Sequence, residues 1–412
     1  MSTPEVQIFG DLYSFTWSKW NLCIELDRLH EHRDGHTSAE IKITTTAPGF
    51  DPYLHRSTLN LSTQRTRDDL AKSMSHKYDL ADWDTVLEQL CWITLDHYRA
   101  GEPIVIIGNS DEPISPGYLL YPLLPLKQPS LIYGDGGTGK SYLALFMALT
   151  IQLPYDAAMW HPDQANVLYL DWETDSSMAG NRVKRLKAGM GFPNELALPY
   201  RRCALPLADD ITAIKRMVDE YKIGLVVIDS CGGACGGDPS SPETCNRFFV
   251  ALRTLNVTSL LIHHVPKHAN PASPSKDKSP YGSAYFYNWS RAVFLLRRHQ
   301  EAEDNEMDIG LFHKKANEDS LTAPMGFQLT FHDDQTHVRI KSDISDVPEF
   351  LESLSCRARI RQMLKTMSVG SIDEIAEELE LKKDTVRKTI GRMEEKKMII
   401  RVGDKWGLLR DE

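Results

Sequence analysis

Residues 134–141 have the types and spacing of a loop that binds phosphate. The stretch "GDGGTGKS" fits the pattern G-x-x-x-x-G-K-[ST]. Its glycines let backbone N–H groups turn toward an anion, while Lys140 is expected at the β and γ phosphates of a nucleotide and Ser141 at its Mg²⁺. The predicted nucleotide-binding residues are Gly134, Asp135, Gly136, Gly137, Thr138, Gly139, Lys140, Ser141 and Tyr142.

The elements on both sides of this loop are the ones that a phosphate site needs. An apolar run at 130–133 predicts a short strand that enters the loop, and residues 141–153 predict an apolar-rich helix that ends before Pro154. The N-terminus of that helix adds its partial positive charge. A glycine-rich turn that binds nothing is the alternative, and the agreement of loop and flanks favours the nucleotide site.

Two later apolar runs end in carboxylates that could complete the site. The run 166–171 ends just before Glu173, and the run 223–228 ends at Asp229. Parallel strands present ligand-binding side chains at their carboxyl ends, so Asp229 is expected to hold Mg²⁺ with Ser141. Because no Glu follows Asp229, Glu173 is expected to orient the water that attacks the γ phosphate. The alternatives are a turn cap for Asp229 and a plain surface position for Glu173.

A third apolar run, 258–262, ends in two histidines at 263 and 264. A polar residue here could sense the γ phosphate, although such residues are also common as simple polar ends of strands. The polar loop 267–281 follows, and another apolar run begins near Arg291. The loop is the expected contact for single-stranded DNA, through Lys267, Lys276 and Lys278.

The order of these runs predicts the fold of the middle of the chain. Apolar strands alternate with helical stretches, which is the pattern of an α/β domain with a mainly parallel sheet. The linker-like stretches "GNSDEPISPGY" and "SDISDVPEF" bound this segment. The sequence therefore predicts three parts: residues 1–110, an ATPase domain at 111–345, and a C-terminal domain at 355–412.

Taken together, the motifs resemble those of the RepA-type hexameric replicative helicases of plasmids, within the RecA-like ATPase superfamily. The resemblance covers roughly residues 115–335 and is carried by "YGDGGTGKS", "LYLDWE", "VVIDS", "LLIHHVPK", "GSAYFYNWSRAVF" and "HKKAN". It implies a RecA-like core, a homo-oligomer that is a hexamer, ATP with Mg²⁺, and single-stranded DNA in the ring channel.

The resemblance also implies roles for single residues. His264 falls on the γ-phosphate sensor, and Arg291 falls on the arginine finger that reaches a neighbouring subunit's nucleotide. Lys315 and Asn317 match a pattern near the same interface. The expected catalytic set is Lys140, Glu173, Asp229, His264 and Arg291, with Ser141 and Asp229 as Mg²⁺ ligands.

The C-terminal segment reads as helix, turn, helix and a two-stranded wing, and it resembles a winged helix-turn-helix domain. Val386, Ile390 and Met393 follow helical spacing and are expected to face inward. A protein-docking role is the alternative to DNA binding. The predicted DNA-contacting face consists of Lys382, Thr385, Thr389 and Arg392.

The first 110 residues lie outside the resemblance. "AEIKITTT" alternates like a strand, and "DWDTVLEQLCWITLDHYRAG" reads as an amphipathic helix that begins at Asp82 or Asp84 and ends at Gly101. An α+β domain of unassigned role is therefore expected.

Charge and composition limit the functional classes. A net charge of −10 over 412 residues argues against a protein that coats nucleic acid with its whole surface. From Cys356 onward, 14 Lys and Arg stand against 11 Asp and Glu, so this tail carries +3 and nucleic acid should be bound locally. No membrane span or signal peptide is indicated, and the seven cysteines suggest reduced thiols, so a cytoplasmic protein is expected.

The resulting prediction is a Mg²⁺-dependent ATPase that moves on single-stranded DNA during replication of a plasmid, phage or other mobile element. Two alternatives stay open. One is a recombination or helicase-loading ATPase that remodels DNA–protein complexes without unwinding, and the other is a regulator that binds duplex DNA through its tail and uses ATP to set its oligomeric state.

Overall fold

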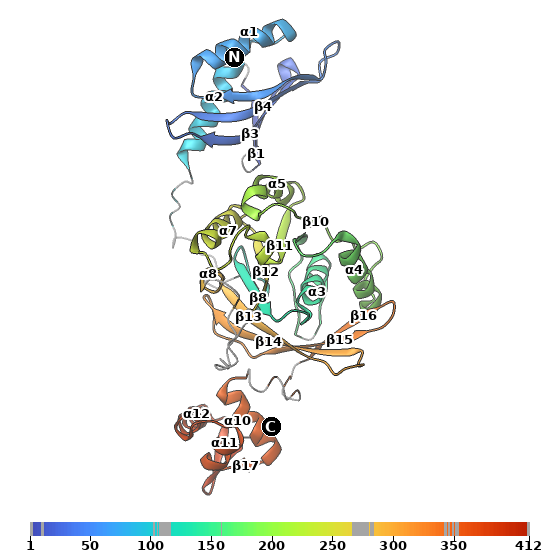
Figure 1. Cartoon of the computed structure of the whole chain (residues 1–412), viewed down its shortest axis with the longest axis vertical. Coiled ribbons are helices and arrows are strands. Elements are labelled where there is room, and N and C mark those ends of the chain that lie inside the picture. Colours follow the sequence, from blue (N-terminus) through green and yellow to red (C-terminus); the bar gives the residue numbers. More distant parts are fainter. Residues whose placement is uncertain are drawn as a thin grey trace. The chain divides into compact units, whose positions relative to one another are not determined.

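The computed structural model describes residues 3–9, 12–101, 117–157, 159–265, 284–341 and 354–409, with single positions at 104, 106, 280, 344, 347 and 350. The chain divides into two compact units, whose elements are labelled in Figure 1. The first contains Met1–Ser115, Leu207–Ile223 and Val250–Asn256, and the second contains Pro116–Pro206, Gly224–Phe249 and Val257–Glu412.

The first unit opens with an antiparallel sheet whose five strands pair in chain order. Burial alternates along them, and in β4 every second residue from Thr37 to Thr45 is buried. Because side chains alternate across a strand, this pattern places one face on a core and leaves the other open. The strands are β1 (Glu5–Phe9), β2 (Leu12–Trp17), β3 (Leu22–Glu31), β4 (Thr37–Thr45) and β5 (Tyr53–Asn60), with a short 3₁₀ turn at Ser18–Trp20.

Two helices, α1 (Gln64–Lys77) and α2 (Trp83–Ala100), complete the core of this sheet. Asp82 begins α2, because its side chain accepts a hydrogen bond from the Thr85 backbone N–H at 3.2 Å. Gly101 ends α2 with a φ of 64°. The helix predicted for this stretch therefore has the predicted ends.

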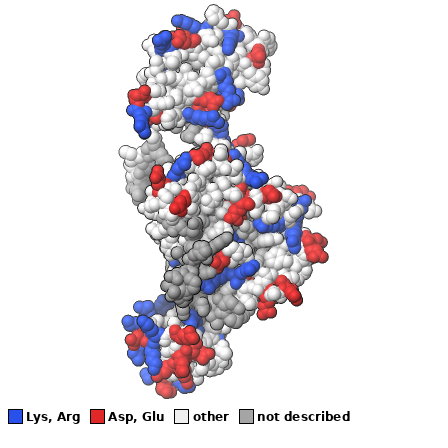
Figure 2. Space-filling model, in the orientation of Figure 1, with Lys and Arg blue, Asp and Glu red and all other residues white. Residues whose placement is uncertain are grey.

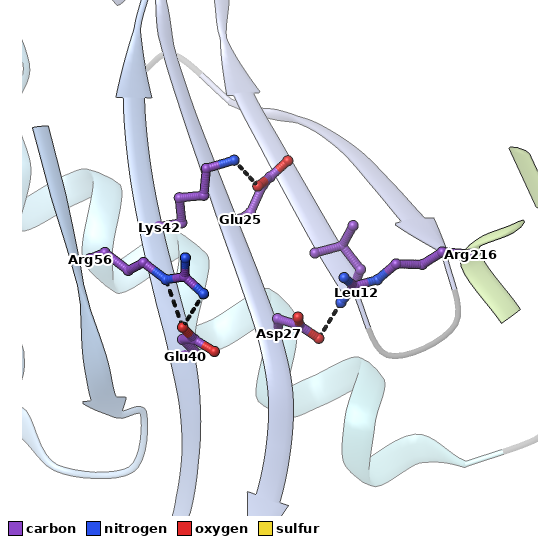
Figure 3. Close-up of a pocket in the computed structure, with 7 residues that line it drawn as sticks. All are labelled: Leu12, Glu25, Asp27, Glu40, Lys42, Arg56 and Arg216. Atoms are coloured by element: carbon purple, nitrogen blue, oxygen red, sulfur yellow. Dashed lines mark hydrogen bonds and ion pairs between the residues drawn. The ribbon is translucent and has the colours of Figure 1, made fainter. Parts of the chain in front are cut away.

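The open face of the same sheet carries charged side chains in pairs (Figure 3). Three such pairs line a pocket on this face: Lys42 with Glu25, Arg56 with Glu40, and Asp27 with Arg216 of α5 (Leu207–Glu220), which belongs to the same unit. Three acidic and three basic side chains line this pocket, so the charges of the pocket lining balance.

The second unit is built around a nine-stranded sheet with the order β10-β9-β11-β12-β8-β13-β14-β15-β16 (Figure 1). Pairing is parallel from β11 through β12 and β8 to β13, and antiparallel from β13 to β16. The strands are β8 (Pro129–Gly134), β9 (Asn166–Asp171), β10 (Tyr200–Arg202), β11 (Ile223–Asp229), β12 (Thr258–His264), β13 (Ala292–His299), β14 (Glu306–Ala316), β15 (Met325–Phe331) and β16 (Thr336–Lys341).

Helix α3 (Lys140–Gln152) follows β8 and is buried on nearly all sides, from Leu143 to Ile151. A helix that is apolar all round belongs in the interior of a large domain, and α3 packs in the same core as β8, β9, β11 and β12. Six further strands and helices lie among the described residues between 117 and β13: β6 (Tyr118–Leu120), β7 (Leu124–Pro125), α4 (Ser176–Met190), α6 (Cys231–Ala234), α7 (Pro242–Thr254) and α8 (Ala284–Trp289).

The C-terminal part has a small core of its own, which includes Ile360, Ile375, Val386, Ile390 and Met393. The last three are the α12 residues predicted to face inward, and all three are buried. A Ser371–Glu374 capping box begins α11. The elements are α10 (Cys356–Met367), β17 (Val369–Gly370), α11 (Ile372–Glu378), α12 (Lys383–Glu395), β18 (Ile399–Val402) and β19 (Lys405–Leu408), and the strands pair in the order β17-β19-β18.

The predicted α/β class with a large, mostly parallel sheet is confirmed. The antiparallel extension β14–β16 was not part of the prediction. Within the described part of the chain, none of the helices combines the length and the apolar character that a membrane span requires. The division into three domains stays a prediction.

Candidate nucleotide site

The predicted phosphate loop joins the end of β8 to the start of α3. Gly139 has a φ of +86°, which favours glycine, and the Cβ of any other residue at Gly134 would lie 2.5 Å from the Leu296 carbonyl oxygen. Asp135, Gly136 and Gly137 are exposed between them. Glycine is therefore favoured at position 139 by the backbone conformation. At position 134 it is required because the backbone of β13 lies too close for a side chain.

Lys140 is the first residue of α3 and is 5% exposed. Its Nζ donates to the carbonyl oxygens of Gly134 at 3.0 Å and Asp135 at 2.6 Å. Burial lowers the pKa of Lys140, and the nearby carboxylates of Glu173 and Asp229 oppose that shift. The ammonium thus lies inside the loop, at the place where phosphate charge is expected.

Asp229 ends β11 and is buried. Its Oδ2 accepts a hydrogen bond from the Tyr169 hydroxyl at 2.6 Å, whereas its Oδ1 has no hydrogen-bond partner among the described residues. Burial raises the pKa of Asp229, while Tyr169 and the neighbouring Ser141 hydroxyl act to lower it. A buried carboxylate oxygen next to a hydroxyl at a phosphate loop is a donor set that fits Mg²⁺.

Glu173 follows β9 and its side chain is 36% exposed. Its Oε1 accepts hydrogen bonds from His264 Nε2 at 2.6 Å and from the Ser230 hydroxyl at 2.7 Å. The His264 bond, followed by that of Ser230, lowers the pKa of Glu173 to about 2, against the opposing effect of partial burial. Glu173 is therefore an ionised carboxylate at neutral pH, suited to orient water through its charge rather than to hold a proton.

Asp171, the last residue of β9, fixes the segment that carries Glu173 and was missed by the sequence analysis. Its Oδ1 accepts from the backbone N–H groups of Glu173 and Thr174, each at 2.8 Å, and its Oδ2 accepts from the Tyr200 hydroxyl at 3.0 Å. Asp171 is 2% exposed. A carboxylate at the end of a fully apolar run was the available signal.

Tyr142 lies in the first turn of α3, where its ring meets a planar cation and a second aromatic ring. The Arg182 guanidinium lies 5.5 Å from the ring centroid, and the Phe331 ring lies 5.4 Å away in an edge-on arrangement. Guanidinium and aromatic planes next to a phosphate loop can hold a nucleotide base by stacking. Arg182 and Phe331 were not predicted, because they come from α4 and β15.

Parallel pairing explains why the predicted residues converge. His264 at the end of β12 pairs in register with Gly134 at the end of β8. The Trp172 backbone N–H, next to Glu173, donates to the Asp229 carbonyl oxygen at 2.6 Å. The structure thus gathers five predicted site residues at one edge of the sheet: Lys140, Ser141, Glu173, Asp229 and His264.

Arg291 lies at the opposite end of β8. Its backbone N–H donates to the Pro129 carbonyl oxygen at 2.8 Å, five residues before Gly134. Five steps of about 3.3 Å along a strand separate it from the loop by roughly 16 Å. Arg291 is therefore not brought to the phosphate loop of its own chain.

Lys315 and Asn317 hold the backbone around Arg291. Lys315 Nζ donates to three carbonyl oxygens at the end of α8, those of Tyr287, Asn288 and Ser290, at 2.8 to 2.9 Å. The Asn317 backbone N–H donates to the Arg291 carbonyl oxygen at 3.0 Å. Lys315 is thus engaged in capping a helix, and Arg291 is half-buried beside it.

The predicted DNA-contacting residues divide into two sets. Lys267, Lys276 and Lys278 lie outside the described residues. In the C-terminal part, Lys382, Thr385 and Arg392 are exposed, whereas Thr389 is half-buried and its hydroxyl donates to the Thr385 carbonyl oxygen at 2.8 Å. Figure 2 shows that most Lys and Arg side chains of the C-terminal part gather on one side of it, while its Asp and Glu side chains gather on a different side. Lys405 of β19 is paired with Glu374 at 2.8 Å.

Comparisons with known proteins concern the middle of the chain. A family model described as "AAA domain" matches residues 97–270, a range that holds Lys140, Glu173, Asp229 and His264. Among solved structures, the chain is similar to a KaiC-like protein from the hyperthermophilic archaeon Pyrococcus horikoshii OT3, at 16% sequence identity and a TM-score of 0.37, over 55% of this chain and 96% of that one. No curated protein matches it. Residues 97–270 are thus similar to an AAA domain, and they lie in an α/β fold with a large, mostly parallel sheet.

Proposed function

We propose that this protein is an ATP-driven DNA motor, similar to a RepA-type hexameric helicase, which acts in replication of a plasmid, phage or other mobile element. The observation that carries the proposal is the convergence of Lys140, the Ser141–Asp229 pair and the Glu173–His264 pair at one sheet edge. Such a set can bind, polarise and hydrolyse a nucleoside triphosphate.

Each residue has a separate task in this proposal. Lys140 exchanges its two carbonyl partners for phosphate oxygens, and Glu173 orients the attacking water. Ser141 and Asp229 are the residues that would hold Mg²⁺, which when bound neutralises charge on the β and γ oxygens. His264 bonds Glu173 directly, so it can exchange that bond for the γ phosphate and so report its presence.

Arg291 supports an assembly of several copies. It lies roughly 16 Å from the phosphate loop of its own chain, at the amino end of β8, where it cannot act on the chain's own nucleotide. We propose that it reaches the nucleotide of a neighbouring copy, which makes turnover depend on a ring. A hexamer is the ring that the resemblance implies.

Two further parts of the proposal concern DNA. The loop 267–281 would contact single-stranded DNA in the ring channel. The C-terminal part, taken as a winged helix, would contact duplex DNA through the exposed Lys382, Thr385 and Arg392 on and beside α12.

The deciding experiment combines unwinding of a forked DNA with imaging of the protein bound to ATP and single-stranded DNA, with Lys140→Ala as the inactive control. The proposal expects closed rings and ATP-dependent strand separation by the parent protein alone. ATPase activity stimulated by DNA without unwinding would select a remodelling or loading ATPase. ATPase activity indifferent to DNA would select a nucleotide-switched regulator.

A further inference from the structure

We propose that Arg298 is a positioning residue for nucleotide binding, which holds the phosphate loop in its binding conformation through the Gly137 carbonyl group. The inference rests on the proposed function, because it adds a residue to the ATP site. Neither the loop motif nor the resemblance assigns a role to Arg298, which is separated from Gly137 by 161 positions in the chain.

The pairing of β13 with β8 places Arg298 beside the phosphate loop. Strand β13 runs parallel to β8, and Leu295 pairs with Tyr133, the residue before Gly134. The chain of β13 therefore continues past the end of β8, alongside the phosphate loop. There, Arg298 Nη1 donates to the Gly137 carbonyl oxygen at 2.8 Å.

This single bond fixes the direction of a loop N–H group. The Gly137 carbonyl and the Thr138 N–H belong to one planar trans peptide, so they point in opposite directions. Because Arg298 holds the carbonyl on its own side, the Thr138 N–H points away from Arg298. Phosphate loops bind through N–H groups that all face the anion, and a free glycine peptide could rotate out of that arrangement.

Two other carbonyl groups of the loop accept hydrogen bonds from a second cation. Lys140 Nζ bonds the carbonyl oxygens of Gly134 and Asp135, so it must leave them when it moves to a phosphate. Arg298 is exposed and its bond to Gly137 does not depend on Lys140. Arg298 can therefore keep the loop ordered while Lys140 changes partners.

The test compares Arg298→Ala and Arg298→Lys with Arg339→Ala, an exposed arginine on β16 of the same sheet. Calorimetric titration measures the Kd for ADP and for a non-hydrolysable ATP analogue, and steady-state assays measure KM and kcat for ATP. Loss of a charge-assisted hydrogen bond that orients the loop is expected to weaken binding of both nucleotides about tenfold in Arg298→Ala. KM should rise by the same factor and kcat should stay within about twofold, because the interaction serves bound substrate and transition state alike.

Arg298→Lys keeps the charge and one donor, so its Kd should lie between those of Arg298→Ala and the parent. If Arg298→Ala does not fold, the Kd of Arg298→Lys is compared with that of the parent protein instead. The inference is overturned if both Arg298 variants bind ADP as tightly as Arg339→Ala, or if kcat falls while Kd is unchanged. A parent protein that is folded and binds no nucleotide would overturn the proposed function as well, so the two failures are distinguishable.

Discussion

His264 Nε2 and Glu173 Oε1 lie 2.6 Å apart, and their hydrogen bond links the ends of β12 and β9 across the intervening strand β11. Ser230, which follows β11, donates to the same oxygen at 2.7 Å. Neither bond involves Oε2 of Glu173. Two strands therefore hold one carboxylate oxygen in place, and the other oxygen is available to a water molecule.

Replacement of Glu173 by Gln should separate binding from turnover. The amide keeps the size of the side chain but loses the charge that orients water, so we expect ATP hydrolysis to fall by a factor of about 10² to 10⁴ while nucleotide binding is retained. Phosphate release and equilibrium binding are measured on the same preparation, with Lys140→Ala as the variant that loses hydrolysis completely. Hydrolysis by Glu173→Gln at the parent rate would remove Glu173 from the site.

The lowered pKa of Glu173 predicts how stability depends on pH. Its pKa is about 2 in the folded protein, mainly because of His264, against 4.5 for the unperturbed group. A carboxyl group with a depressed folded-state pKa stabilises the fold fully above about pH 4.5, and this contribution is lost as the pH falls toward 2.

The measurement is the free energy of unfolding in urea for the parent and for Glu173→Gln at pH 6, 4 and 3. The difference between the two proteins should be largest at pH 6 and should shrink at each lower pH. Glu301→Gln, at an exposed position, controls for the general loss of one carboxyl group. A difference that stays constant over this range would show that His264 does not bind the Glu173 carboxylate in solution.

Arg291→Ala should behave as an interface variant. The side chain lies far from the loop of its own chain, so nucleotide binding should be retained while assembly-dependent hydrolysis is lost. Mixing Arg291→Ala with Lys140→Ala can place an intact loop of one copy beside an intact arginine of another, and part of the activity should return. Activity of the mixture equal to that of the two inactive proteins added together would count against action between copies.

Lys382 and Arg392 should contribute to the salt dependence of duplex binding. Each cation that neutralises a phosphate adds about one unit to the slope of log affinity against log salt, so the double alanine variant should have a slope lower by roughly two. Basal ATPase activity should be unchanged. The control replaces Arg202 and Arg339, two exposed arginines of the large sheet, by alanine. An unchanged slope would favour protein docking as the role of the C-terminal part.

Sequence reasoning worked where a local pattern decides the structure. The glycines at 134 and 139 follow from backbone geometry at the loop, and Asp229 and His264 follow from the rule that parallel strands present their carboxyl ends together. The ends of α2 followed from Asp82 and Gly101. In these cases a few neighbouring residues contain the whole signal.

Contacts that depend on distant pairing could not be predicted. Arg298 meets Gly137 only because β13 pairs beside β8, and Phe331 meets Tyr142 only because antiparallel strands extend the sheet. Helical spacing also assigned Thr389 to the outward face, whereas its hydroxyl is bonded to the Thr385 carbonyl oxygen and lies 3.4 Å from the Cys356 sulfur of α10. Periodicity gives a direction around a helix but not which neighbouring helix covers its flank.

The hairpin of β13 and β14 has consequences beyond support of the loop. One end of the hairpin contacts the predicted phosphate loop. Arg298 donates a hydrogen bond to the Gly137 carbonyl oxygen, and it pairs in register with Ile309, whose side chain lies next to Gly139. The other end begins beside Arg291, with Ala292 paired to Ala316. The two strands are paired from His299 and Asp308 to Ala292 and Ala316, with a register shift between Val293 and Phe294, so one hairpin joins the loop to Arg291. In the proposed ring, the hairpin would therefore connect the nucleotide of one copy with the arginine that serves the nucleotide of the next copy.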